Sequence, residues 1–308
     1  MEEASQHIVE ANDQQEKKKT RILSRALPSQ ETAFGCPRDF LENRFVYVVV
    51  SARARGLSVG VNMNPDKECN FECAYCEVHR SDPPRESKLD VDAMAAELKR
   101  TLNLVREGRL RERPWYHTLP DELLQLRHVA LSGDGEPTTA PDFAESVQAV
   151  VHVRALGGFP FFKLVLLTNA TGLDQAQVQQ GLKFFTKSDE IWVKLDGGTQ
   201  AYLNKVDRMN VPLEKVLMNI LALARQRPVV IQSLFPSING EEPPLEEIEQ
   251  YAQRLKELKA NGAQIPLVQI YSATRPTPNS GCGHLPLKTL SRIAQAVRQS
   301  TGLKAEVF

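Results

Sequence analysis

The sequence predicts an α/β protein built around a parallel sheet. Six short apolar segments are each followed by a longer segment with apolar residues at helical spacing. Strict alternation of this kind indicates parallel strands joined by right-handed helical crossovers, and the short apolar strands are typical of a sheet covered on both faces. Six units are fewer than the eight of a closed barrel. The residues alone therefore leave two architectures open, an incomplete barrel and a doubly wound sheet.

The composition is that of a folded protein. The 308 residues are 42% hydrophobic and 25% charged, which excludes a chain disordered throughout and allows one barrel or two ordinary domains. No apolar run approaches the roughly 18 residues of a membrane helix, and the N-terminus is acidic and polar, unlike a signal peptide. We therefore expect a cytoplasmic protein without a membrane partner. The 38 basic and 38 acidic residues cancel, so charge does not favour a nucleic-acid partner, although a local basic patch stays possible.

The chain divides into a tail and a single larger region. Residues 1–33 have no apolar period and carry a charged run, which predicts a flexible tail, with a docking arm as the alternative. Residues 34–308 form the predicted barrel domain.

The elements are expected in a regular order. Residues 45–50 and 57–63 read as two strands, because the first is aromatic and β-branched and the second alternates. A cysteine-containing loop separates them from a helix at 90–106. The remaining strands with their helices are 128–131 with 141–154, 163–167 with 174–185, 190–195 with 212–225, 228–234 with 244–259, and 266–271 with 287–299. In either architecture, function belongs at the carboxyl ends of the strands.

Three of the five cysteines crowd into the loop after the first parallel strand. Cys69, Cys73 and Cys76 are separated by three and two residues. A clustered, odd count without a secretion signal favours metal binding or catalysis over disulfides. Three thiolates in one loop can hold three irons of a four-iron, four-sulfur cluster and leave the fourth iron open to a ligand. A zinc site completed by His79, or a group of buried reduced thiols, remains an alternative on spacing alone.

The second parallel strand ends in Gly133, Asp134, Gly135, Glu136 and Pro137. Glycines let a ligand approach the backbone closely, and a glutamate can bind an ammonium group through charge-assisted hydrogen bonds. The alternative is a turn that only starts the next helix.

Polar side chains also mark the ends of the later strands. Lys194 and Asp196 have the two-residue spacing that puts both on one face of a strand. Charges in an apolar strand are costly unless they are paired or bound to a ligand, so an internal ion pair is the alternative to a ligand site. The other polar residues at such ends are Thr168 and Asn169 on the third strand and Gln232 and Ser233 on the fifth.

The last unit supplies the two candidate catalytic residues. The forked donors of Arg275 suit an anion or a carboxylate. For Cys282 three roles are open: a reduced thiol without a function, a catalytic hydrogen donor, and an extra metal ligand.

The cysteine loop, CNFECAYC, resembles the signature loop of the radical S-adenosylmethionine (radical SAM) superfamily, including the aromatic Tyr75 directly before the last cysteine. From Gly56 to Pro278, the segments GDGEPT, TNATG, VKLDGGTQAYLNKVDR, IQSLFPSINGEE and IYSATRP follow in an order similar to that of one branch, the tRNA wyosine synthases.

This resemblance implies an incomplete (β/α)6 barrel with a short N-terminal strand extension. It implies a radical SAM enzyme with a [4Fe-4S] cluster on Cys69, Cys73 and Cys76, whose open iron chelates the amino and carboxylate groups of S-adenosyl-L-methionine. An electron from a donor such as flavodoxin or ferredoxin would cleave SAM to methionine and a 5′-deoxyadenosyl radical, which abstracts hydrogen from a substrate.

The resemblance also implies roles for the polar residues at the strand ends. Tyr75 would lie near the adenine, the segment Gly133–Pro137 would receive the amino group, and Lys194 and Asp196 would meet the carboxylate and ribose. Thr168, Asn169, Gln232 and Ser233 would complete the SAM site.

The sequence departs from the wyosine synthases in one respect. Those enzymes bind a second cluster through further cysteines before the signature loop, and here that region holds Cys36 alone. Together with the absence of net positive charge, this favours a substrate other than tRNA. A tRNA base-modifying enzyme and a non-enzymatic zinc-binding interaction module are the alternatives.

Overall fold

One curved sheet of eight strands organises the computed structural model, which describes residues 34–35, 40–159 and 161–308. The strands follow one another in chain order, with β1 antiparallel to β2 and each later pair parallel. In a doubly wound sheet the spatial order of the strands reverses at one point along the chain. Here it does not reverse, so the expected incomplete barrel is confirmed. The strands are β1 (Val46–Ser51), β2 (Gly56–Asn62), β3 (Leu126–Ser132), β4 (Lys163–Thr168), β5 (Glu190–Lys194), β6 (Val230–Leu234), β8 (Val268–Tyr271) and β10 (Ala305–Val307).

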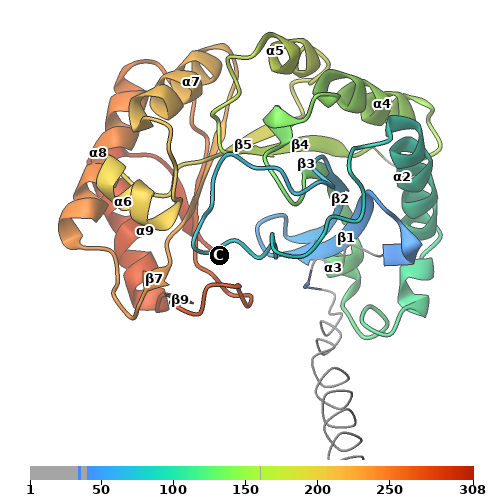
Figure 1. Ribbon diagram of the computed structural model, residues 1–308, viewed down its shortest axis with the longest axis horizontal. Helices are drawn as coiled ribbons and strands as arrows, with labels where there is room; N and C mark the ends of the chain where they lie inside the picture. Colours follow the sequence, from blue (N-terminus) through green and yellow to red (C-terminus); the bar gives the residue numbers. More distant parts are fainter. Residues whose placement is uncertain (1–33, 36–39, 160) are drawn as a thin grey trace, which may run out of the picture. The chain divides into compact units, whose positions relative to one another are not determined.

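Helices cover the outer, convex side of this half-barrel (Figure 1). They are α2 (Val91–Arg106), α4 (Phe143–Ala155), α5 (Ala176–Leu182), α7 (Leu213–Gln226), α8 (Leu245–Ala260) and α9 (Leu287–Thr301). The helix α6 (Gln200–Val206) follows the carboxyl end of β5. The short elements are α3 (Asp121–Leu124), the 3-10 turns η1 (Phe40–Glu42), η2 (Arg109–Glu112) and η3 (Pro137–Thr139), and the two-residue strands β7 (Ser237–Ile238) and β9 (Cys282–Gly283), which pair with each other.

Two elements of the barrel were not expected from the sequence. β10 adds a further parallel strand beside β8, and α6 lies between β5 and α7. Both are short, three and seven residues, so neither contains a hydrophobic period long enough to identify it. The helix expected at 174–185 is shorter than predicted and spans only Ala176–Leu182.

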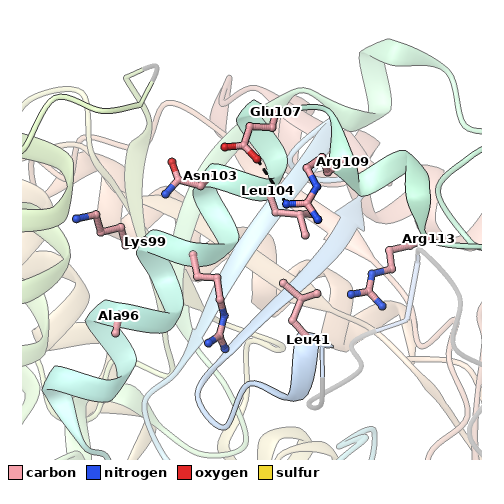
Figure 2. Close-up of a pocket in the computed structure, with 9 residues that line it drawn as sticks. Leu41, Ala96, Lys99, Asn103, Leu104, Glu107, Arg109 and Arg113 are labelled. Carbon is pink, nitrogen blue, oxygen red and sulfur yellow. Dashed lines mark ion pairs between the residues drawn. The ribbon is translucent and has the colours of Figure 1, made fainter.

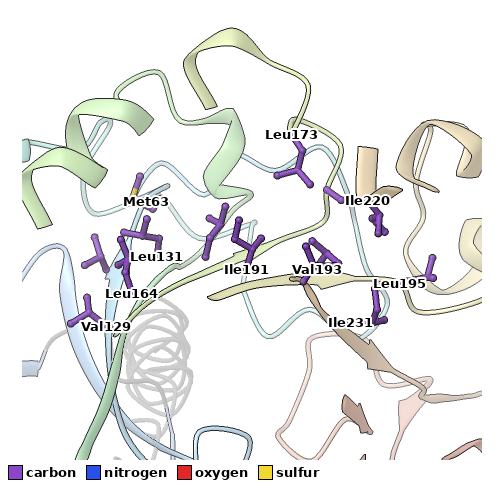
Figure 3. Packing of buried hydrophobic residues seen from close by; sticks show 14 of the residues in the cluster. Met63, Val129, Leu131, Leu164, Leu173, Ile191, Val193, Leu195, Ile220 and Ile231 are labelled. Atoms are coloured by element: carbon purple, nitrogen blue, oxygen red, sulfur yellow. The ribbon is translucent and has the colours of Figure 1, made fainter. Parts of the chain in front are cut away.

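The strands direct apolar side chains outward and more polar ones inward. In β3, the fully buried Val129 and Leu131 belong to the core between sheet and helices (Figure 3), whereas His128, Ala130 and Ser132 line a cavity. This follows from the two-residue period of a strand. The concave side of the sheet is therefore available for a ligand site.

No helix in the described part of the chain is both long and apolar enough to span a membrane. The tail expected at residues 1–33 and Cys36 lie outside the described residues. The described residues from Phe34 onward belong to one compact unit that extends to Phe308.

Candidate functional site

The cysteine loop follows β2 and is tied to the turn after β4. Asn70, next to the first cysteine, accepts a hydrogen bond of 2.8 Å from the Asn169 amide and donates one of 2.7 Å to the Thr171 hydroxyl. Thr171 and Asn169 are themselves joined, since the Thr171 hydroxyl donates to the Asn169 side-chain oxygen at 2.7 Å. The TNATG segment therefore lies against the cysteine loop, as the predicted position of both at carboxyl ends of strands requires.

The segment after β3 packs against the same loop through its backbone. The Glu136 N–H donates to the Glu68 carbonyl oxygen at 3.2 Å, directly before the first cysteine. A Cβ at Gly135 would collide with that carbonyl oxygen, so only glycine allows this approach. The cysteine loop and the glycine-containing segment after β3, which were predicted to share a site, therefore do lie in contact.

A third anchor comes from the end of α6. The Ala74 N–H donates to the Val206 carbonyl oxygen at 2.7 Å, and the Glu72 N–H donates to that of Asp207 at 3.2 Å. The cysteine loop is thus held by β3, β4 and α6 at once. This leaves the cysteine side chains on a fixed backbone.

The three thiols are half-buried. Burial raises the pKa of Cys69, and burial together with the charge of Asp207 raises the pKa of Cys73 well above its ordinary value. Across residues 34–35, 40–159 and 161–308, no three His, Cys, Asp or Glu side chains are arranged to hold one metal ion. The thiols are therefore not preassembled around a single ion, either alone or together with His79.

The donor set nevertheless fits a four-iron cluster. In such a cluster each cysteine sulfur binds a different iron, so the sulfurs need not converge on one point, and thiolates are the ligands that iron–sulfur clusters take. A single zinc ion would instead need its sulfurs about 2.3 Å from a common centre. Cys76 also lines the cavity inside the barrel, which gives a ligand access to this end of the loop.

Glu136 is an internal acceptor in this structure. Its carboxylate accepts hydrogen bonds from the Thr138 N–H and hydroxyl, the Thr168 hydroxyl at 2.5 Å and the Asn169 N–H at 2.7 Å. Burial raises its pKa even though these four hydrogen bonds act in the opposite direction. Thr168, Asn169 and Glu136 are therefore brought together as predicted, but they bond one another, and a contact of Glu136 with SAM stays a prediction.

Asp134 is joined to the end of β2. The Asn62 amide donates to its carboxylate at 2.8 Å, and the Asp134 N–H donates to the Asn62 side-chain oxygen at 2.9 Å. Gly133 has a φ of +134° and lies so close to Asn62 that a Cβ would collide with it. The turn after β3 is thereby fixed with Gly133 at the cavity wall. Pro137 begins the buried turn η3.

A buried charged network surrounds Tyr75. Its hydroxyl contacts the carboxylates of both Asp196 and Asp207, the latter at 2.9 Å, and Lys194 pairs with Asp196 at 3.2 Å while lying 4.7 Å from the centre of the Tyr75 ring. Tyr75 has one proton to donate, so one of the two carboxyl groups must itself be protonated. Burial and then the charge of Asp196 raise the pKa of Asp207 well above its usual range.

Lys194 stays charged in this network. Burial is the largest single influence and would lower its pKa, but the neighbouring negative groups, chiefly Asp196, together outweigh burial and raise it. The internal Lys194–Asp196 ion pair, the alternative to a ligand site on this strand, is thus present in the structure. Their contact with SAM stays a prediction.

Gln232 and Ser233 lie on opposite faces of β6. The Gln232 amide donates to the Gln269 side-chain oxygen at 3.3 Å, whereas the Ser233 hydroxyl lies 2.6 Å from that of Tyr251 in α8. Neighbouring residues of a strand point in opposite directions, so only one of the two can face the barrel interior. The arrangement therefore gives no support to Ser233 as a SAM contact, because its hydroxyl is used against α8.

A cavity of about 570 Å³ occupies the concave side of the sheet. Tyr75, Cys76, Ser132 and Gly133 line it, together with residues from β1, β5, β6 and β8. Its volume is within the usual range for small-molecule sites.

The two candidate catalytic residues lie in different places. Arg275 lines this cavity and forms an ion pair of 2.8 Å with Glu77, the residue after the last cysteine. Cys282 lies in β9 at a separate surface hollow, and burial raises its pKa. Arg275 therefore belongs to the candidate site, and Cys282 lines a different hollow.

A larger hollow of about 700 Å³ lies between α2 and η2 (Figure 2). Its wall includes Lys99, Arg109 and Arg113, and Glu107 pairs with Arg109 at 3.6 Å. None of the four cysteines in the described part of the chain lines it, and neither does any predicted SAM residue. Volume alone therefore does not identify the candidate site.

The sequence did not single out several residues of the site. Asn70 and Asp207 lie within the CNFECAYC and LNKVDR segments, so those motifs contained the signal, although neither residue stood out by type. His128 and Arg53 line the same cavity. The inward position of His128 could have been found from the alternation of β3, whereas the position of Arg53 in a turn offers no such signal.

Comparisons with known proteins find sequence relatives and solved structures of similar fold. No protein-family model matches the chain. Two UPF0026 proteins of Helicobacter pylori strains are each 27% identical, over 187 residues (58% of this chain, 52% of that protein) and 244 residues (76% and 67%). A UPF0026 protein of Synechocystis is 30% identical over 183 residues, which cover 57% of each chain. The chain thus spans about half to two thirds of the length of these relatives.

Solved structures with a similar fold include a radical SAM methyltransferase, TYW1 and a spore photoproduct lyase. A radical SAM methyltransferase from Sphaerobacter thermophilus has a TM-score of 0.58 at 16% identity, covering 85% of this chain and 68% of its own. TYW1 with a lysine-pyruvate adduct bound has a TM-score of 0.54 at 13% identity, covering 84% and 85%. A spore photoproduct lyase mutant has a TM-score of 0.52 at 10% identity, covering 85% and 79%. At such identities the likeness shows the fold alone.

Proposed function

We propose that this protein is a radical SAM enzyme that cleaves S-adenosylmethionine reductively and abstracts a hydrogen atom from an organic substrate. The observation that carries the proposal is the position of the CNFECAYC loop. It follows the first parallel strand of a half-barrel of the radical SAM type, is held by three other segments, and presents Cys76 to the interior cavity. Sites at the carboxyl ends of barrel strands are where such folds perform chemistry.

In this proposal Cys69, Cys73 and Cys76 hold a [4Fe-4S] cluster. Once bound, the cluster would supply an electron to SAM, giving methionine and a 5′-deoxyadenosyl radical. The protein's own task is to place the reactants and exclude water from them. The fixed backbone of the cysteine loop and the half-buried thiols serve that task.

Tyr75 and Gly133 are the proposed SAM contacts, because both line the cavity beside Cys76. The Tyr75 ring is oriented by the contacts of its hydroxyl with Asp196 and Asp207. Glu136 and Thr168 contribute indirectly, since their hydrogen bonds to each other fix the strand ends around SAM. The electron must come from another molecule, and we propose a one-electron donor protein such as flavodoxin or ferredoxin.

The proposal is tested by anaerobic reconstitution of the full chain with iron and sulfide. We expect about four irons per chain, as the cluster requires, and release of 5′-deoxyadenosine from SAM after reduction with dithionite. Iron and product should be lost in the triple variant Cys69→Ala/Cys73→Ala/Cys76→Ala. The matched control for iron binding is Cys282→Ala, which removes a half-buried thiol outside the loop and should leave the iron content unchanged.

Two outcomes would overturn the proposal. Stoichiometric zinc without iron or sulfide in anaerobically purified protein would favour a zinc-binding interaction module. Undiminished 5′-deoxyadenosine from the triple variant would show that the three cysteines do not hold the reacting group.

A further inference from the structure

The interior cavity extends beyond the residues proposed to contact SAM. Further along its wall lie Arg53, Ser58, His128 and Trp192. None of these belongs to the cysteine loop or to the glycine-containing segment after β3. The cavity therefore has a second group of polar residues that the proposed SAM contacts do not use.

Arg53 is the unbalanced charge of this cavity. It lies on the turn between β1 and β2, with its guanidinium 4.1 Å from the ring centre of Tyr271 at the end of β8. Its Nε is buried without a hydrogen-bond partner. The other two full charges in the cavity wall, Glu77 and Arg275, pair with each other at 2.8 Å. Among the described lining residues, one positive charge is therefore left without a carboxylate.

His128 is a second unsatisfied polar group in the same wall. The side chain is 2% exposed, and its Nδ1 has no hydrogen-bond partner in the described structure. Its ring packs edge-on against Trp192, with 5.3 Å between the ring centres. Burial, followed by the charges of Lys163 and Arg53, lowers its pKa to about 3, so the imidazole is neutral at pH 7. A neutral imidazole can donate one hydrogen bond and accept another.

Groups of this kind are costly to bury without a partner. An unsatisfied buried donor or acceptor costs about 1–3 kcal/mol. The guanidinium offers two parallel donors that match the oxygens of a carboxylate or a phosphate. The aromatic side chains of Tyr47, Trp192 and Tyr271 line the same cavity. A ligand with an anionic group and an apolar body would satisfy all of these features at once.

We propose that Arg53 and His128 bind the substrate, and that the substrate is an organic anion whose carboxylate or phosphate lies on Arg53 and whose apolar part lies against Trp192 and Tyr271. Assigning this ligand as the substrate rests on the proposed function, whereas the anion site itself does not. SAM brings a carboxylate of its own, but in the proposed function that group is bound at the cysteine loop.

The test uses three probes that share a phenyl group and differ in charge: phenylacetate, phenyl phosphate and the neutral phenylacetamide. The chain has two tryptophans, and Trp115 is 44% exposed, so Trp115→Phe leaves Trp192 as a fluorescent reporter in the cavity wall. Binding is measured by titration of the full chain at pH 7, with and without reconstituted iron. We expect saturable binding of at least one anion, about tenfold or more tighter than that of the amide.

Arg53→Gln should weaken anion binding by about tenfold or more. Arg53→Lys should weaken it by less, because lysine keeps the positive charge but lacks the paired donors of the guanidinium. The matched control is Arg55→Gln on the same turn. Arg55 pairs with Glu306 of β10 at 2.7 Å and does not line the cavity, so its loss should leave the dissociation constant unchanged. His128→Gln should weaken the binding of both anions, and both should still bind more tightly than the amide.

Preference for the carboxylate or for the phosphate would define the anion, and either supports the proposal. It is overturned if no probe binds, if the amide binds as tightly as the anions, or if Arg53→Gln and Arg53→Lys both bind like the parent. The proposal is also overturned if Arg55→Gln weakens anion binding as much as Arg53→Gln does, because the loss would then come from a disturbed turn and not from the Arg53 guanidinium. None of these titrations requires SAM, reductant or bound iron, so their failure leaves the proposed function standing, and failure of iron binding leaves the anion site standing.

Discussion

The side-chain amide of Asn169 donates a hydrogen bond of 2.8 Å to the side-chain oxygen of Asn70. Asn70 lies between the first two cysteines of the loop, and Asn169 lies directly after β4, so the bond joins segments that are 99 residues apart in the chain. The backbone N–H of Asn169 in turn donates to the Glu136 carboxylate at 2.7 Å. One asparagine therefore joins the ends of β3 and β4 to the cysteine loop.

Replacement of Asn70 by alanine should loosen this junction. The bonds to Asn169 and Thr171 would both be lost, leaving buried polar groups without partners. We expect the free energy of unfolding to fall by about 1–3 kcal/mol and the reconstituted protein to retain less iron. Urea unfolding and iron analysis measure the two effects. Gln180→Ala, at an exposed residue of α5, should change stability by less than about 0.5 kcal/mol, and equal stability of the two variants would contradict the proposed role.

Gly135→Ala should displace the cysteine loop. The new methyl group would collide with the backbone carbonyl oxygen of Glu68, which cannot rotate away as a side chain could. Overpacking of this kind costs about 1–3 kcal/mol, and more where backbone must move. The control is Gly158→Ala, where a Cβ meets nothing within 4 Å. A thermal-unfolding comparison in which both variants match the parent would show that the two segments do not pack this closely.

Lys194→Met should be strongly destabilising. It removes the cation 3.2 Å from Asp196, whose side chain is fully buried, and so leaves an uncompensated carboxylate. Breaking a buried pair in this way costs about 3–5 kcal/mol. Lys205→Met, which breaks an exposed pair with Glu241, should cost about 1 kcal/mol or less.

A second substitution at Asp196 separates the cost of its uncompensated charge from the cost of the packing lost with the Lys194 side chain. The double variant Lys194→Met/Asp196→Asn should regain part of the lost stability in urea unfolding. If the double variant is no more stable than Lys194→Met, the uncompensated charge is not the cause of the loss.

His128 should make the fold sensitive to acid. Its pKa is lowered to about 3 in the folded protein, chiefly by burial, against about 6.5 in an unfolded chain. Between these values the unfolded state binds the extra proton, so this residue's contribution to stability is present above pH 6.5 and is lost as the pH falls toward 3. The loss approaches about 1.4 kcal/mol per pH unit within that window.

The measurement compares urea unfolding of the parent and His128→Gln between pH 7 and pH 4.5. Groups that titrate in both proteins cancel in the difference, which leaves the contribution of His128. The advantage of the parent over the variant should shrink as the pH falls. A difference that stays constant, or grows in acid, would show that His128 is not buried as a neutral group.

Much of the fold follows from local patterns. The six parallel strands and their main helices were predictable because each long helix repeats its apolar residues at helical spacing and each strand is short and apolar. β10 and α6 were not, because they depend on partners elsewhere in the chain. β10 exists as the neighbour of β8, and the carbonyl groups at the end of α6 receive the N–H groups of Glu72 and Ala74.

The candidate site was predictable as a set of segments but less so as a set of contacts. Alternation along β6 would have placed Gln232 and Ser233 on opposite faces, and Ser233 does bond to Tyr251 of α8. The use of Glu136 as an internal acceptor depends on Thr138, Thr168 and Asn169 converging on it, which spacing along the chain does not reveal. Arg53 reaches Tyr271 only because the first hairpin lies across the open side of the barrel.

The anchoring of the cysteine loop has a consequence for biosynthesis. The loop follows the second strand to be translated, yet its backbone N–H groups bond the carbonyl oxygens of Val206 and Asp207, and Asn70 bonds Asn169. All of these partners leave the ribosome later than the cysteines. The loop therefore reaches its final conformation only after β5 and α6 have been synthesised, and until then its thiols are exposed to oxidation and to competing metal ions in the cell.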